Sequence, residues 1–141
     1  MTARRPSGPP APTVARLDGS VTALAPLAEA ITARYLAEFP EDVERHGEAT
    51  PEWCRHDNQW LLSWAVDDVR GATDLVEQAQ WLARVLHVRG IRVSRLARDL
   101  EIASEVVRPG AFGAGSEAVA ERLHAAARTV AAMTLSASAA Q

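Results

Sequence analysis

The sequence is short of cysteine and of long hydrophobic runs. Among its 141 residues Cys54 is the only cysteine, so no internal disulfide can form and a reducing cytoplasm is the natural compartment. The longest uncharged run, residues 129–141, is too short and too polar to span a bilayer. No apolar segment follows the N-terminal arginines, as a signal peptide would require. We therefore expect a cytoplasmic protein without a membrane partner.

An excess of positive charge is also lacking. The net charge is −3 and the isoelectric point about 5.8, which gives no general attraction to phosphate backbones, so we expect no nucleic-acid partner. A local group of arginines surrounds the turn expected after residue 89, and we interpret it as a solvated basic rim near a helix C-terminus, where cations are favoured. This group consists of Arg84, Arg89, Arg92, Arg95 and Arg98.

The composition itself is that of an ordinary globular protein. Hydrophobic residues make up 48% and charged residues 23%, and the chain is long enough for one domain with a core. Prolines at positions 6, 9, 10 and 12 predict a disordered arm over residues 1–17, because little apolar surface there offsets the entropy of ordering. The tail, residues 136–141, is expected to fray. A single domain over residues 18–135 remains.

Within this domain the apolar residues recur with the period of a helix, and no strand is predicted. The pattern predicts an all-α fold of about six helices, packed as a globin-like or orthogonal bundle. The expected helices run from Ser20 to Phe39 (delayed or kinked by Pro26) and over residues 40–46, 50–68, 74–89, 94–107 and 116–133.

Four polar residues are predicted to cap the later helices. Thr50 precedes a proline and an acid, and Asp74 has Glu77 three residues later, as in a capping box. Ser94 and Ser116 precede the last two helical patterns and are expected to act as N-caps.

Three tryptophans form the most distinctive pattern. Trp53, Trp60 and Trp64 are separated by seven and four residues, which places them within about 40° of one line on a helix, with His56 at its edge. Tryptophans at this spacing usually pack in a core. Alternatively, they form one wall of a cavity for a flat apolar cofactor such as haem, another tetrapyrrole or a corrinoid like cobalamin.

A second apolar stripe lies on the next predicted helix. Trp81, Val85 and Val88 are turned away from that helix's main apolar face by about 100°. A helix that is apolar on two sides is either central in the fold or contacts another protomer. We therefore predict that Trp81, Val85 and Val88 form a homodimer interface, with burial in the core as the alternative.

No catalytic or metal-binding constellation emerges. The four histidines lack the spacing of metal ligands, and Cys54 on an apolar stripe is interpreted as an inert core residue. Side chains at Asp67 and Asp68 diverge on a helix, which disfavours paired acid–base chemistry. We predict no enzyme activity, no metal and no cofactor, with haem or cobalamin as the alternative named above.

Part of the chain resembles known helical sensor modules. The segments that carry the resemblance are Trp60–Ala65, Trp81–Leu86, Arg89–Ile91 and the pair Leu96 and Leu100. They look like the helical module of actinobacterial cobalamin-binding regulators and are similar to the non-haem globin sensor domains of stressosome scaffold proteins. The resemblance covers about a third of the chain, and no corrinoid-binding signature follows it. It implies a globin-like fold, dimerisation through helices and a regulatory role, exerted on a separate partner protein.

Overall fold

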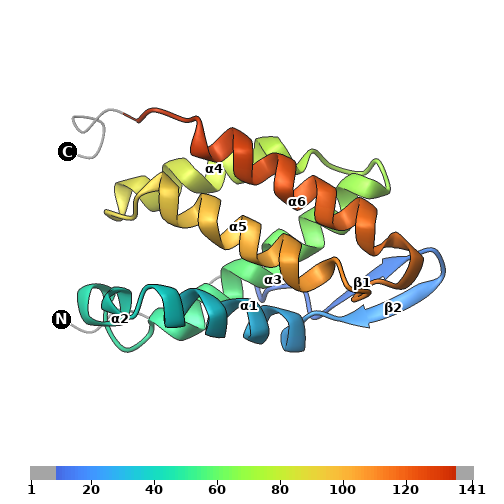
Figure 1. Cartoon of the computed structure of the whole chain (residues 1–141), viewed down its shortest axis with the longest axis horizontal. Helices are drawn as coiled ribbons and strands as arrows, with labels where there is room; N and C mark the ends of the chain where they lie inside the picture. The colour runs from blue at the N-terminus through green and yellow to red at the C-terminus, as the bar shows by residue number, and fades with distance from the viewer. Residues whose placement is uncertain (1–8, 136–141) are drawn as a thin grey trace.

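The computed structural model describes residues 9–135, which form six α-helices and one β-hairpin (Figure 1). The elements are β1 (Val14–Leu17), β2 (Ser20–Ala23), α1 (Ala25–Glu38), α2 (Glu41–His46), α3 (Thr50–Val69), α4 (Leu75–Val88), α5 (Val93–Val107) and α6 (Ser116–Ala131), with a 3₁₀ turn at Gly113–Gly115 before α6. The predicted helical fold with six helices is thus confirmed. A globin-like topology stays a prediction.

The hairpin corrects the prediction that the domain has no strand. β1 and β2 are antiparallel, with Leu17 opposite Ser20, and the two turn residues Asp18 and Gly19 have positive φ values of 51° and 80°. Positive φ at both central residues defines the turn type that Asp-Gly favours in two-residue hairpins. The Asp18-Gly19 pair was therefore the local signal for strands.

The same hairpin corrects part of the predicted disordered arm. Residues 14–17 form β1, and Ala15 and Leu17 on alternate positions of that strand are buried in the core. The Gln59 side chain donates a hydrogen bond of 2.9 Å to the carbonyl of Pro12, which ties the preceding segment to α3. Residues 1–8 and the tail expected to fray, 136–141, lie outside the described residues.

The helix starts differ in part from the predicted caps. Asp74 accepts a hydrogen bond of 3.2 Å from the Glu77 amide, as predicted. Ser20, however, begins β2, and α1 starts at Ala25 with Pro26 in its first turn. A proline inside the apolar pattern thus delayed the helix rather than kinking it, since its missing amide needs no partner there.

The hydroxyls of Thr50 and Ser116 bind loop atoms instead of helix amides. Thr50 donates to the Gly47 carbonyl at 2.6 Å, and the Ser116 hydroxyl accepts from the Phe112 amide at 2.8 Å. The α5 helix begins one residue before Ser94, with Arg92 as its N-cap and no side-chain capping bond. These three predicted N-caps are therefore wrong, and two of the hydroxyls stabilise the turn that leads into the helix.

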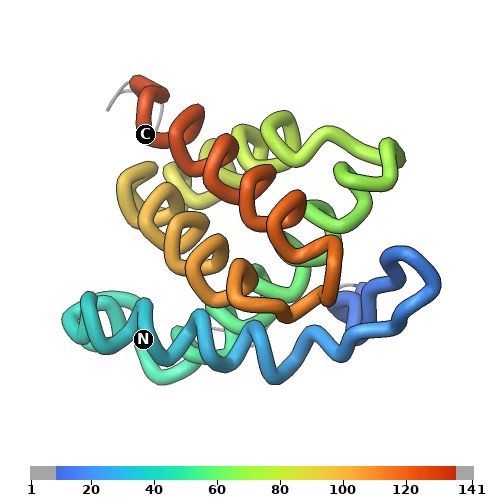
Figure 2. Tube along the Cα trace, turned by 45° about the vertical axis from the view of Figure 1, so that its right-hand side comes forward, coloured from blue at the N-terminus to red at the C-terminus, as the bar shows by residue number. Residues whose placement is uncertain are grey.

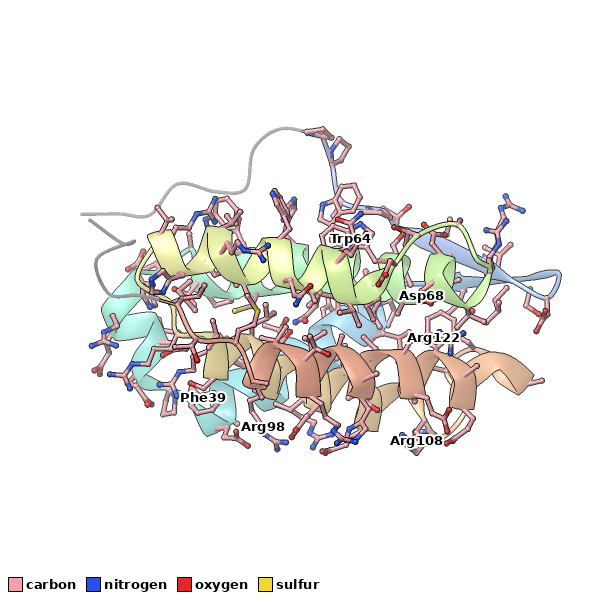
Figure 3. All side chains as sticks on the ribbon, turned by 90° about the horizontal axis from the view of Figure 1, so that it is seen from above. Phe39, Trp64, Asp68, Arg98, Arg108 and Arg122 are labelled. Carbon is pink, nitrogen blue, oxygen red and sulfur yellow. The ribbon has the colours of Figure 1, made fainter. Side chains whose placement is uncertain are left out.

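The core lies between α5 and α6, which lie side by side in opposite directions, and the helices α1, α3 and α4 (Figures 1 and 2). The hairpin projects at one end, and α2 lies at the opposite end. The largest fully buried side chains include Leu61, Leu62, Leu100, Ile102 and Leu123. Ion pairs join the helices at the rim, among them Asp68 with Arg122 at 2.8 Å and Glu38 with Arg98 at 2.8 Å (Figure 3).

Gly115 is the point where the hairpin approaches the start of α6. A Cβ atom at this position would lie 2.3 Å from Cδ2 of Leu17 and 3.1 Å from its Cγ, although the backbone φ of −81° suits any residue. We expect Gly115→Ala to lower the free energy of unfolding by about 1–3 kcal/mol through overpacking alone. Urea unfolding followed by circular dichroism measures this loss.

A double-mutant cycle with Leu17→Ala provides the control. Because the shortened side chain removes the clashing atoms, Gly115→Ala should cost less in the Leu17→Ala background than in the wild type. Equal losses in the two backgrounds would contradict the packing of the hairpin against Gly115.

Candidate ligand-binding cavity

A cavity of about 530 Å³ has α2 in its lining, and Figure 1 shows that α2 lies at the end of the bundle opposite the hairpin. The ends of α1, α3, α4 and α5 meet there, and the short helix α2 closes one side. The lining is mainly apolar and comprises Tyr35, Asp42, His46, Thr50, Trp53, Cys54, Asp57, Leu61, Leu86, Arg89, Ile91, Arg95, Leu96 and Asp99. Small-molecule sites typically have volumes of about 300–1,000 Å³ and combine apolar walls with a few polar groups, as this cavity does.

The first set of polar side chains in the cavity is the hydrogen-bonded series Tyr35, Asp42 and Arg95. The Tyr35 hydroxyl donates to one oxygen of the buried Asp42 carboxylate, and Arg95 approaches the other oxygen at 3.4 Å. Arg95 also donates to Glu41 at 3.1 Å, and its guanidinium lies 3.8 Å from the centre of the Phe39 ring. Burial, and next the bond to Asp42, raises the pKa of Tyr35, so this phenol remains a neutral donor.

The second polar group is Asp99, on the cavity side of α5. Its side chain is only 9% exposed, and burial raises its pKa to about 7. A hydrogen bond with the Asn58 side chain opposes this rise, whereas the negative charge of Asp57 adds to it. Neither neighbour is a cation, so the carboxylate of Asp99 has no compensating charge, in contrast to Asp42.

Asn58, the hydrogen-bonding neighbour of Asp99, does not itself line the cavity. It is fully buried, and its amide nitrogen donates to the Thr32 hydroxyl at 3.1 Å. Its side-chain oxygen is buried and has no hydrogen-bond partner among the described residues. Buried polar atoms in this state are uncommon and call for a donor.

Cys54 lies in the cavity wall as a neutral thiol. Burial raises its pKa, and the negative charges of Asp99, Asp57 and Asp42 raise it further. Because a thiolate is the reactive form, this environment disfavours nucleophilic chemistry. The thiol therefore acts as a small apolar group of the wall.

Trp53 and Arg89 form part of the cavity's rim. The guanidinium of Arg89, just after α4, lies 4.7 Å from the centre of the Trp53 ring, and Arg89 is exposed. A cation over an indole face is attracted by the ring's quadrupole. The half-buried indole thus presents an aromatic wall to the cavity.

The predicted tryptophan stripe is only partly brought to this site. Trp53 lines the cavity, whereas Trp60 and Trp64 lie farther along α3, with ring centres 5.8 Å apart, and His56 contacts Trp53 edge-on at 5.8 Å without lining the cavity. Figure 3 places Trp64 on the side of α3 away from α6. All three indoles are half-buried. The deeply buried face of α3 instead carries Asn58, Leu61, Leu62, Ala65 and Val66.

The predicted interface stripe on α4 is exposed at two of its three positions. Trp81 is 54% exposed and Val88 is 67% exposed, and Val85 between them is half-buried. Leu82 and Leu86 of the same helix are buried in the core. The stripe is therefore not part of the core of this chain.

The polar groups of the cavity were not found by sequence interpretation, which named neither Tyr35 with Asp42 nor Asp99 as functional. A signal existed for Asp99, because it lies within the apolar pattern that Leu96, Leu100 and Ala103 define on one helix face. An acid on such a face is buried when the helix packs. Nothing comparable marked Asp42, whose partners come from α1 and α5.

Metal-binding clusters and membrane-spanning helices are both absent from the described residues. In residues 9–135, no three His, Cys, Asp or Glu side chains are grouped so that they could hold a metal ion. None of the helices over the same range has the length and apolar character needed to cross a membrane.

Comparisons with known proteins identify no relative. No protein-family model matches the chain, and no curated protein or solved structure is significantly similar to it. The class defined by fold and site is therefore a mostly helical domain of six helices with a cavity at one end. The resemblance to sensor modules stays a prediction.

The raised pKa of Asp99 makes stability depend on pH. The folded protein retains the Asp99 proton up to about pH 7, whereas the unfolded chain releases it near pH 3.8. The folded state thus binds more protons in this range, and its free energy of unfolding falls as the pH rises from about 4 to 7. Asp99→Asn removes this dependence. We expect the free energy of unfolding of the variant to increase relative to that of the wild type as the pH rises from about 4, by up to about 4 kcal/mol at pH 8.

Urea unfolding of both proteins at several pH values between 4 and 8 measures the difference. Other titrating groups contribute equally to the two curves and cancel when one is subtracted from the other. Curves that remain parallel over the whole range would contradict the buried, uncompensated state of Asp99.

Proposed function

We propose that this protein is a non-catalytic, regulatory domain that binds a small, mainly apolar molecule in the cavity between α2 and the ends of the long helices. The observation that carries the proposal is the cavity itself, with a volume of about 530 Å³ and largely apolar walls that include Trp53 and Leu86. A site of this kind is the usual location of a small-molecule ligand.

The states of the cavity's reactive groups support binding over catalysis. Tyr35 and Cys54 both have raised pKa values and remain protonated, and the Asp42 carboxylate is already engaged by Tyr35 and Arg95. An activated nucleophile needs a lowered pKa or an adjacent free base. The arrangement instead fixes the positions of polar groups around an apolar space.

The alternative ligand for this cavity is a flat cofactor such as haem or cobalamin. Trp53 supports it by presenting an indole to the cavity, and His46 lines the same space. Trp60, Trp64 and His56, which the sequence grouped with Trp53, do not line the cavity, so support for a stack of indoles is limited to one ring.

Filling the cavity tests the proposal. Ile91 is half-buried in the lining, so Ile91→Trp places an indole in the space with little loss of core packing. The neutral fluorescent probe N-phenyl-1-naphthylamine should bind the wild type at one site, and the variant should bind it at least about tenfold more weakly, a difference of about 1.4 kcal/mol. Fluorescence titration gives both affinities.

Val76→Trp is the matched control, because Val76 is also half-buried but lies on α4 outside the cavity lining. This control should bind the probe as the wild type does. Equal affinity of Ile91→Trp and wild type, or no saturable binding at all, would refute a ligand site in this cavity.

A second proposal concerns self-association. We infer that the domain forms a homodimer through the exposed stripe of α4. Trp81 and Val88 are 54% and 67% exposed, on a different face of α4 from the one that packs in the core. Exposed tryptophan with neighbouring valine is typical of interfaces, where aromatic residues are enriched. A separate regulatory protein could bind the same stripe.

Charge placed in the stripe tests the dimer. The double variant Trp81→Glu with Val88→Glu should be monomeric at micromolar concentration, where we expect the wild type to be a dimer by light scattering, because two protomers would each bury unpaired carboxylates. Ala125→Glu, at an exposed position of α6, is the control and should leave the mass unchanged. A monomeric wild type, or a dimeric double variant, would contradict this interface.

A further inference from the structure

We propose that the cavity binds apolar primary amines, with the ammonium group of the ligand paired with Asp99. This inference rests on the proposed function, since it names the chemical class of the ligand for the same cavity. Each of the other charged groups in the lining has a partner or is partly exposed, whereas the buried carboxylate of Asp99 has no counter-charge.

The cations of the lining are already engaged. Arg95 is bound to Asp42 and Glu41 at 3.4 and 3.1 Å, and Arg89 lies over Trp53 at the exposed rim. An anionic headgroup placed deep in the cavity would therefore have to displace an existing ion pair. Such a displacement leaves Asp42 buried without its cation, which is strongly unfavourable.

The acids of the lining differ in the same respect. Asp42 is paired with Arg95 and accepts from Tyr35, and Asp57 has 23% of its side chain exposed and lies 3.4 Å from the His56 ring. Asp99 is nine-tenths buried, borders the cavity and has no cation among the groups that act on it. A buried carboxylate without a counter-charge is costly, and a ligand that supplies the charge recovers that cost on binding.

The lining around Asp99 suits an alkylammonium ligand. An ammonium donates up to three hydrogen bonds, and the Asp99 carboxylate borders the cavity as an acceptor, whereas Asn58 is fully buried and does not line the cavity. Leu61, Leu86 and Leu96 line the rest of the cavity and provide an apolar environment for a hydrocarbon chain. The predicted ligand is thus an amine at one end and apolar over most of its length.

The charge state of Asp99 makes binding depend on pH. The groups that face it across the cavity are Tyr35 on α1, Asp42 and His46 on α2, Cys54 and Asp57 on α3, Arg89 after α4 and Arg95 on its own helix. Since the pKa of Asp99 is raised to about 7, the carboxylate is mostly protonated at pH 6 and mostly ionised at pH 8. Affinity for an ammonium that stays charged should therefore rise about tenfold over this range.

Three ligands with the same eight-carbon chain and different headgroups test the proposal. Octylamine, octan-1-ol and octanoate are titrated by calorimetry and by displacement of N-phenyl-1-naphthylamine at pH 8. We expect octylamine to bind at least about tenfold more tightly than octan-1-ol, and octanoate to bind most weakly. Asp99→Asn should abolish the preference for the amine and its pH dependence while leaving octan-1-ol unaffected.

Asp67→Asn is the control, because it removes a half-buried carboxylate of α3 that lies outside the cavity lining, and octylamine affinity should change by less than about twofold. The preference of the wild type for amine over alcohol keeps the test valid even if Asp99→Asn fails to fold. Equal binding of amine and alcohol, or tightest binding of octanoate, overturns the inference. If the probe still binds in the cavity, the proposed function survives that failure.

Discussion

Asp42 holds together the end of the bundle on which the cavity depends. It lies on the short helix α2 and joins Tyr35 of α1 to Arg95 of α5 through its two carboxylate oxygens. Arg95 continues the contact to Phe39, between α1 and α2. Because both oxygens of this buried carboxylate are satisfied, α2 is held against the open ends of the longer helices. Without it, the space between those helix ends would have no wall on this side.

The two buried acids of the cavity are therefore different in kind. Asp42 is paired and hydrogen-bonded, so its charge is part of the fold, whereas Asp99 is held by the packing of α5 and has no counter-charge. Leu96 and Leu100 fix α5 in the core, which forces Asp99 to face the cavity. Stability given up at such a position is a common mark of a functional group, since strain or uncompensated charge persists only where the surrounding structure enforces it.

Local signals predicted the helices well and the site poorly. The apolar period located the five long helices, and Asp74 with Glu77 capped α4 as predicted. The hairpin was missed because the prolines before it predicted disorder and the apolar residues after Ser20 fitted the period of a helix, although Asp18-Gly19 is itself a hairpin-turn signal. The cavity could not be predicted, because its lining comes from five helices or their ends, and the link from Tyr35 through Asp42 to Arg95 joins residues up to 60 positions apart along the chain. Spacing within one helix contains no information on such contacts.

The helix α4 connects the two proposals. Its buried side carries Leu86 into the cavity wall and leads to Arg89 at the rim, while its other side exposes Trp81 and Val88. A ligand that moved Leu86 or Arg89 would therefore shift the exposed stripe on the same rigid helix. Binding and dimerisation are coupled only if the ligand has different affinities for the two association states, and by linkage the dimer must then change ligand affinity by the same factor. A shared helix supplies a physical route for that coupling, and the size of the coupling depends on how far α4 can move against the core formed by α5 and α6.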